Sequence, residues 1–86
     1  MELERANSLR ILGLSSARRQ QFEKAEGLLL EALELDKQQA ASLKIAADLE
    51  ALAELAGLKK DTAGQQDYSK RAQAVRESSV SRPQNR

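Results

Sequence analysis

The 86-residue sequence has no cysteine and no histidine. Their absence excludes disulfides and thiolate chemistry, and it removes the side chains that most often act as general base or transition-metal ligand. Proline occurs once, and aromatic residues make up only 2% of the chain. A β-sheet protein of this size needs more aromatic and β-branched residues than that. We therefore expect an all-α protein that is not an enzyme and that holds no cofactor and no metal ion.

Excess charge of one sign is also missing, since the formal net charge is +1. This balance creates no overall field for nucleic acid or for an anionic membrane. No apolar run approaches the roughly 20 residues that span a bilayer, and the first residues lack the basic and apolar regions of a signal peptide. The lack of cysteine fits a reducing compartment. We expect a cytoplasmic protein without membrane contact.

The sequence is rich in leucine and alanine at helical spacing. Between positions 22 and 35, apolar residues recur in steps of three and four, and acidic residues occupy the opposite face. The whole pattern predicts four helices at about 2–19, 22–35, 37–57 and 62–78. Asp36 is expected to cap the third helix at its N-terminus, with Gln39 completing a capping box.

These helices are expected to form one domain over residues 1–79, followed by a flexible C-terminal tail over 80–86. Two amphipathic helices joined by a short hinge must fold back antiparallel to bury their apolar stripes. Gly13 lies inside the first helix, where glycine costs about 0.5–1 kcal/mol relative to alanine. We interpret Gly13 as a point of close helix approach.

The landmarks of the first two helices resemble the tetratricopeptide repeat, a degenerate 34-residue helix-turn-helix module. The sequence has the Leu-Gly pair of that family at Leu12 and Gly13, and an aromatic residue at Phe22. Alanines follow Gly13 at the family's spacing, at Ala25 and Ala32. Three other positions depart from the family, which most often has Trp, Gly and Pro where this chain has Leu9, Gln20 and Lys37.

A second, looser copy of these landmarks follows at an offset of about 40 residues. The resemblance implies two antiparallel helical hairpins stacked as a right-handed superhelical fragment. It also implies the residues that pack within and between the repeats. These are Leu9, Leu12, Gly13, Phe22, Ala25, Leu29, Ala32, Leu49, Leu52, Ala53, Tyr68 and Ala72.

In this family, the first helix of each repeat lines a concave groove that binds a peptide. The matching groove positions are Asn7, Arg10, Leu14, Ala17, Arg18, Ala47, Glu50 and Glu54, with Leu58 at the end of the same helix. Arg10 and Arg18 are two helical turns apart, so both can reach one acidic ligand. The alternative is that they are solvated charges on an amphipathic helix.

The resemblance implies a non-catalytic protein–protein interaction module, an adaptor, scaffold or co-chaperone-like protein that binds a partner peptide or helix. Two alternatives remain open. The basic turns at residues 18–19 and 59–60 could serve a nucleic-acid-associated module. Two repeats also bury little core, so the chain could be a self-associating structural protein or stand beside further repeats of a longer chain. We therefore predict dimerisation or marginal thermal stability.

Overall fold

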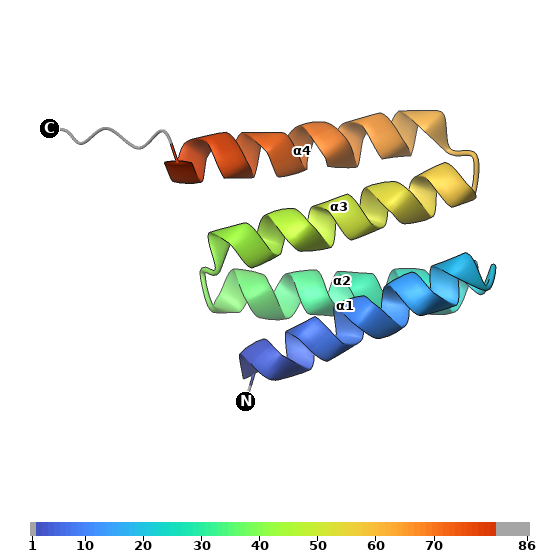
Figure 1. Cartoon of the computed structure of the whole chain (residues 1–86), viewed down its shortest axis with the longest axis horizontal. Helices are drawn as coiled ribbons and strands as arrows, with labels where there is room; N and C mark the ends of the chain where they lie inside the picture. Colours follow the sequence, from blue (N-terminus) through green and yellow to red (C-terminus); the bar gives the residue numbers. More distant parts are fainter. Residues whose placement is uncertain (1, 81–86) are drawn as a thin grey trace, which may run out of the picture.

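The computed structural model describes the backbone of residues 2–80 and the side chains of residues 4–78. The chain forms four α-helices: α1 (Glu2–Arg18), α2 (Phe22–Gln38), α3 (Ser42–Leu58) and α4 (Thr62–Val80). Consecutive helices run antiparallel as two hairpins, and residues 2–80 contain no strand (Figure 1). The prediction of an all-α fold built from helical hairpins is confirmed.

All three turns between the helices have the same construction. Each has three residues, and its middle residue has a positive φ, at Gln20 (66°), Ala40 (53°) and Lys60 (66°). In the second turn, the N–H of Ala41 donates to the carbonyl of Asp36 (3.1 Å) and that of Ala40 to the carbonyl of Lys37 (3.0 Å). This is the Schellman pattern, which satisfies the last carbonyls of a helix and reverses the chain. The turn geometry therefore fixes a spacing of 20 residues from one helix start to the next.

The predicted boundary between the second and third helices is wrong. α2 continues to Gln38, and Asp36 is a buried residue of its last turns, not the cap of the next helix. α3 begins at Ser42, after Ala41, which makes no side-chain capping bond. The sequence pattern of Asp36 and Gln39 matches a capping box, but the Asp36 carboxylate faces Arg10 of α1 instead of the start of α3.

The other ends differ by smaller amounts. α1 ends at Arg18, one residue early, and α4 continues through Val80, two residues beyond the prediction. Val80 was assigned to the tail but is helical. The remainder of the predicted tail, 81–86, lies outside the described residues.

α3 is the central helix of the fold. It packs against all three other helices, whereas α4 packs against α3 alone within residues 2–80 (Figure 1). A closed four-helix bundle would bring α1 and α4 together. The molecule is therefore an open stack in which each hairpin keeps one side free of the other.

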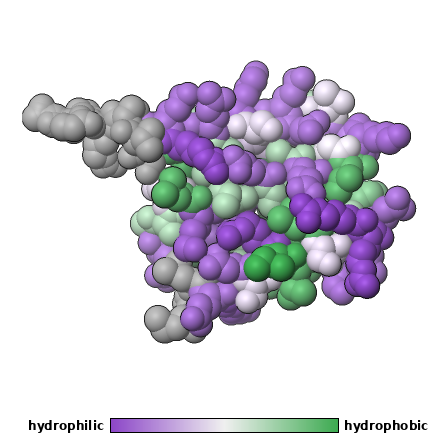
Figure 2. All heavy atoms as spheres, in the orientation of Figure 1, coloured by the Kyte–Doolittle hydropathy of each residue, from purple (hydrophilic) through white to green (hydrophobic). Residues whose placement is uncertain are grey.

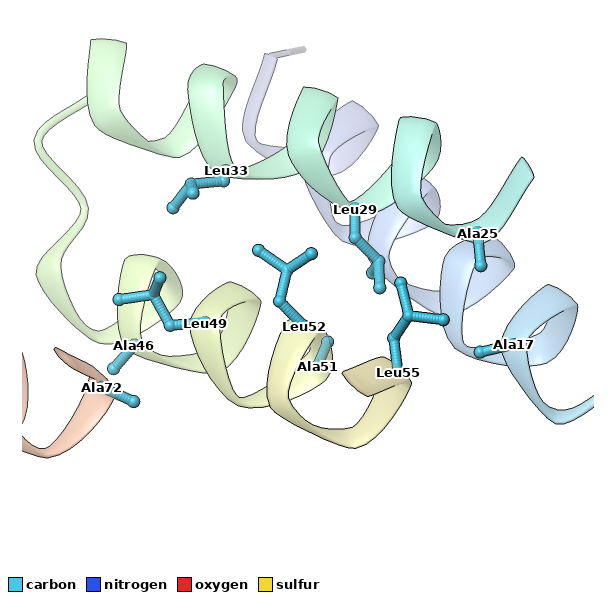
Figure 3. Close-up of a cluster of buried hydrophobic side chains, with 10 residues drawn as sticks. All are labelled: Ala17, Ala25, Leu29, Leu33, Ala46, Leu49, Ala51, Leu52, Leu55 and Ala72. Atoms are coloured by element: carbon cyan, nitrogen blue, oxygen red, sulfur yellow. The ribbon is translucent and has the colours of Figure 1, made fainter. Parts of the chain in front are cut away.

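Leucines of α2 and α3 form the middle of the core. Leu29 and Leu33 of α2 point toward Leu49, Leu52 and Leu55 of α3 (Figure 3). Alanines occupy many of the other buried positions and allow the helix backbones to approach.

Gly13 marks the closest approach of α1 to α2. A Cβ atom at this position would lie 2.6 Å from Cδ2 of Leu29, which is fully buried. Only glycine leaves room for that leucine, because real Cβ atoms do not approach carbon so closely. The interpretation of Gly13 as a point of close helix approach is confirmed.

Candidate partner-binding surface

α1 and α3 lie side by side on one face of the stack, joined by polar side chains. The Arg18 guanidinium donates two hydrogen bonds to the Glu54 carboxylate, of 2.7 Å and 3.1 Å. The Lys44 ammonium donates to Asn7 Oδ1 over 3.2 Å. Residues predicted to line the groove from both copies are therefore brought together along one seam.

This seam defines what we call the α1–α3 face. Its residues follow each other in steps of three, four or seven along each helix, so they share one side of it. They are Asn7, Leu14 and Arg18 of α1, and Leu43, Ala47, Glu50, Glu54 and Leu58 of α3. Leu43 is 61% exposed and Leu58 is 42% exposed. Large apolar side chains thus stand at both ends of the α3 part of this face.

The surface over α1 is shallow and mixed in polarity. A hollow of about 390 Å³ is lined by Ile11, Leu14, Ser15, Arg18 and Arg19. On the side where α1 lies in front of α2, hydrophobic side chains form separate groups between hydrophilic ones (Figure 2). Such a surface offers an apolar contact beside two guanidinium groups.

Two predicted groove residues are not available to a partner, and the prediction is wrong for them. Ala17 is 1% exposed and belongs to the core. The Arg10 side chain is 19% exposed, and its Nη1 donates to Asp48 Oδ1 over 3.1 Å. Both lie on the side of α1 that faces the core, next to the side that carries Leu14.

Leu12 is the clear exception among the predicted packing residues, because it is 55% exposed. Leu9 is half-buried, and Phe22 and Tyr68 are half-buried against the core. The other predicted packing residues are buried: Gly13, Ala25, Leu29, Ala32, Leu49, Leu52, Ala53 and Ala72. Leu12 is exposed because none of the other helices within residues 2–80 covers the side of α1 on which it lies.

Beneath the α1–α3 face lies a buried polar cluster of Arg10, Asp36 and Asp48. Both aspartates are 0% exposed. Arg10 Nη1 lies 3.1 Å from Asp48 Oδ1 and 3.9 Å from Asp36 Oδ2, and Arg10 Nη2 donates to Asn7 Oδ1 over 3.0 Å. One guanidinium therefore faces two carboxyl groups, which would leave one negative charge uncompensated if both were ionised.

A proton resolves this imbalance. The pKa of the Asp48 carboxyl is raised to about 7, chiefly by burial and next by the neighbouring Asp36 carboxylate, while Arg10 opposes the rise. Among the described residues, no hydrogen-bond donor reaches either oxygen of Asp36 or Oδ2 of Asp48. A proton on Asp48 that is donated to Asp36 satisfies oxygens on both residues.

Sequence reasoning missed this cluster. Asp48 lies among alanines and leucines on the most apolar helix, an unusual place for a charged residue, and that position was the available signal. Its partner Arg10 is 38 residues away along the chain, and helical periodicity does not reveal which distant side chain will face it.

The two hairpins carry a related ion pair with the signs exchanged. Arg10 of α1 faces Asp36 of α2, and Glu50 of α3 pairs with Arg76 of α4. Both members of the second pair stand 40 residues after their counterparts, the same offset that separates the starts of α1 and α3 and of α2 and α4. The internal repeat is therefore 40 residues long in the helices themselves.

Three other features could carry a function in this chain: a metal site, an exposed basic edge or a membrane-spanning helix. Within residues 4–78, no group of three or more acidic side chains is placed to hold a metal ion. In the basic turns, Arg18 is engaged by Glu54, which leaves Arg19, Lys59 and Lys60 as exposed cations. None of the helices within residues 2–80 is long and apolar enough to cross a membrane.

Comparison of the chain with protein-family models, curated proteins and solved structures finds no match. The resemblance to the tetratricopeptide repeat accordingly stays an expectation from the residues quoted above.

Proposed function

We propose that this protein is a non-catalytic interaction module that binds a peptide or helix of a partner protein on the α1–α3 face. The observation that carries the proposal is the exposure of Leu43 and Leu58 on the helix that otherwise supplies half of the buried hydrophobic residues. Large apolar side chains on an exposed face beside polar ones are typical of interaction surfaces. A cytoplasmic location is part of the proposal and is supported by the lack of cysteine.

The charges of the face indicate a partner segment that is amphipathic and carries charge. Arg18 and Glu54 hold each other in a pair that is open to water, with side chains 62% and 38% exposed. An exposed pair of this kind contributes little to stability, because water screens the two charges. A carboxylate or ammonium group on the partner can therefore replace one member of the pair while apolar partner side chains cover Leu14 and Leu58.

The test is a selection of binders from a phage-displayed random peptide library on the wild-type protein. Binding of the selected peptides is then measured by fluorescence anisotropy with surface variants. Leu58→Glu places a charge on the α1–α3 face and is expected to weaken binding at least about tenfold, since burial of a leucine is worth about 1.5–3 kcal/mol. Leu30→Glu is the matched control, because Leu30 of α2 is 43% exposed and lies off this face.

Peptides that bind both variants equally well would contradict the assignment to the α1–α3 face. Circular dichroism of each variant shows whether the fold is intact. The nucleic-acid alternative would rely on Arg18, Arg19, Lys59 and Lys60, and no contact within residues 4–78 favours it over a protein partner.

A further inference from the structure

α1 has a second exposed side, which faces away from both α2 and α3. We call it the α1 outer face, and it consists of Glu4, Ser8, Ile11, Leu12, Ser15 and Arg19. Each residue is three or four positions from another of the set, so they share one side of α1, and every one of them is exposed. Arg19 is the first residue after α1, and its N–H still donates to the carbonyl of Ser15. Ile11 is 64% exposed and Leu12 is 55% exposed, so the centre of the face is apolar.

The internal repeat shows what this side of a helix normally does in the molecule. At the 40-residue offset, Ile11 and Leu12 correspond to Ala51 and Leu52 of α3, which are 4% and 1% exposed. Leu52 points toward Leu29 of α2 (Figure 3). The side of α3 that is buried under α2 therefore has an apolar counterpart on α1 that no described residue covers.

The opposite end of the stack does not offer a matching surface. Positions 69 and 73 of α4 correspond to Leu29 and Leu33 of α2 at the same offset, but they hold Ser69 and Gln73, which are both exposed. A polar outer side of this kind typically closes the end of a repeat stack. Head-to-tail stacking of copies through α1 and α4 would pair an apolar face with a polar one.

The α1 outer face is complementary to itself in the antiparallel orientation. When two α1 helices cross at their centres, Ile11 of each copy meets Leu12 of the other, and Ser8 meets Ser15. Glu4 then meets Arg19 at both ends, which places opposite charges together twice. In a two-fold symmetric interface every such contact occurs in duplicate.

We propose that two copies of this protein associate through an antiparallel pairing of their α1 outer faces. One helix from each copy gives an interface below the standard size of about 1,600 Å². The dimer is therefore weak, with a dissociation constant on the order of 10–100 µM. This proposal does not depend on the peptide-binding function, because the two faces share no residue, although they adjoin at the hollow between Leu14 and Ser15.

Sedimentation equilibrium over micromolar to millimolar protein measures the association. The wild-type chain is expected to become dimeric with rising concentration, and Leu12→Glu is expected to remain monomeric. Leu30→Glu is the control, because it places the same charge at a similarly exposed leucine of α2. A wild-type protein that stays monomeric throughout the range, or a Leu12→Glu variant that dimerises like the wild type, would overturn the proposal.

Charge reversal tests the orientation without touching the apolar centre. Glu4→Arg and Arg19→Glu are each expected to weaken the dimer, and the double variant is expected to restore it, because the two contacts are re-formed with exchanged signs. Additive weakening in the double variant would contradict the pairing of residues 4 and 19.

The absence of cysteine allows a direct geometric test. Ser8→Cys protein mixed with Ser15→Cys protein is expected to form dimers with a short bis-maleimide crosslinker. Each variant alone is expected to form few, because identical positions are far apart in the antiparallel pair. Equal crosslinking of each variant with itself would indicate a different interface and overturn the proposal.

Discussion

Asp48 places an ionisable carboxyl group inside a core made of leucine and alanine. Its burial is compensated by Arg10, but Arg10 is shared with Asp36, so the cluster is neutral only when it holds one proton. A buried ionic group of this kind is weak evidence for stability, since an apolar replacement can do as well. Its effect on the fold depends on pH.

We predict that the free energy of unfolding decreases as pH rises from 5 to 8. Because the pKa of Asp48 is raised from its ordinary 3.8 to about 7 in the folded protein, the folded state holds this proton more tightly than the unfolded chain. The stabilisation from this group is full below pH 3.8 and is lost as pH rises through about 7. The decrease in the free energy of unfolding is on the order of 1 kcal/mol or more. Each kcal/mol lowers Tm by about 4–8 °C in a domain of this size.

Asp48→Asn supplies a permanently neutral side chain, so that the Arg10 charge compensates Asp36 alone. Thermal melts should show a higher Tm than wild type at pH 8 and a smaller difference between pH 5 and pH 8. Asp67→Asn is the control, since Asp67 is an exposed partner of Arg71 on α4. A variant whose Tm follows that of the wild type across this pH range would show that Asp48 is not the titrating group.

At the scale of helices and turns, much of the fold could be predicted, because the local signals agree. Apolar residues at helical spacing, such as Leu28, Leu29 and Leu33, alternate with short polar hinges along the sequence. This pattern indicated four helices and two hairpins. The start of α3 was missed because no glycine or proline marks the turn at Ala40. Ala40 has a left-handed φ, a conformation that sequence rules expect at glycine.

The site was predicted less completely than the hairpins. Positions on one helix could be assigned to a common side, and the structure joins Arg18 and Glu54 across the two helices by hydrogen bonds. That these residues bind a partner stays a prediction. The exact rotation of α1 depends on contacts with α2, such as the close approach of Gly13 to Leu29. A rotation of one residue step decides whether Ala17 faces a partner or the core.

Gly13 and Gly27 provide a matched pair for testing helix packing. Gly13→Ala is expected to destabilise the protein by about 1–3 kcal/mol, because the new Cβ would lie 2.6 Å from a buried carbon of Leu29. Gly27→Ala is expected to stabilise it by up to about 1 kcal/mol through helix propensity alone, since a Cβ built there meets no described atom within 4 Å apart from its own turn of helix. Urea denaturation measures both, and a stabilising Gly13→Ala would contradict the close approach of α1 and α2.

For the whole molecule, the open stack makes stability uneven. α3 buries eight residues and contacts every other helix, whereas α4 rests on α3 alone within the described part of the chain. The apolar residues that α4 brings to the core are few: Tyr68, Ala72 and Val75. Helices with few buried apolar contacts open at a lower free energy than the core.

We therefore predict that α4 separates from the stack before the other helices unfold. Native-state hydrogen exchange should show the amides of residues 64–78 exchanging first and those of residues 46–56 exchanging last, with those of α2 between them. The ion pair between Glu50 and Arg76 is exposed, so it contributes only about 0–1 kcal/mol against this opening. Equal protection of α3 and α4 would mean that the two hairpins unfold as one cooperative unit, which an open stack of this contact pattern does not predict.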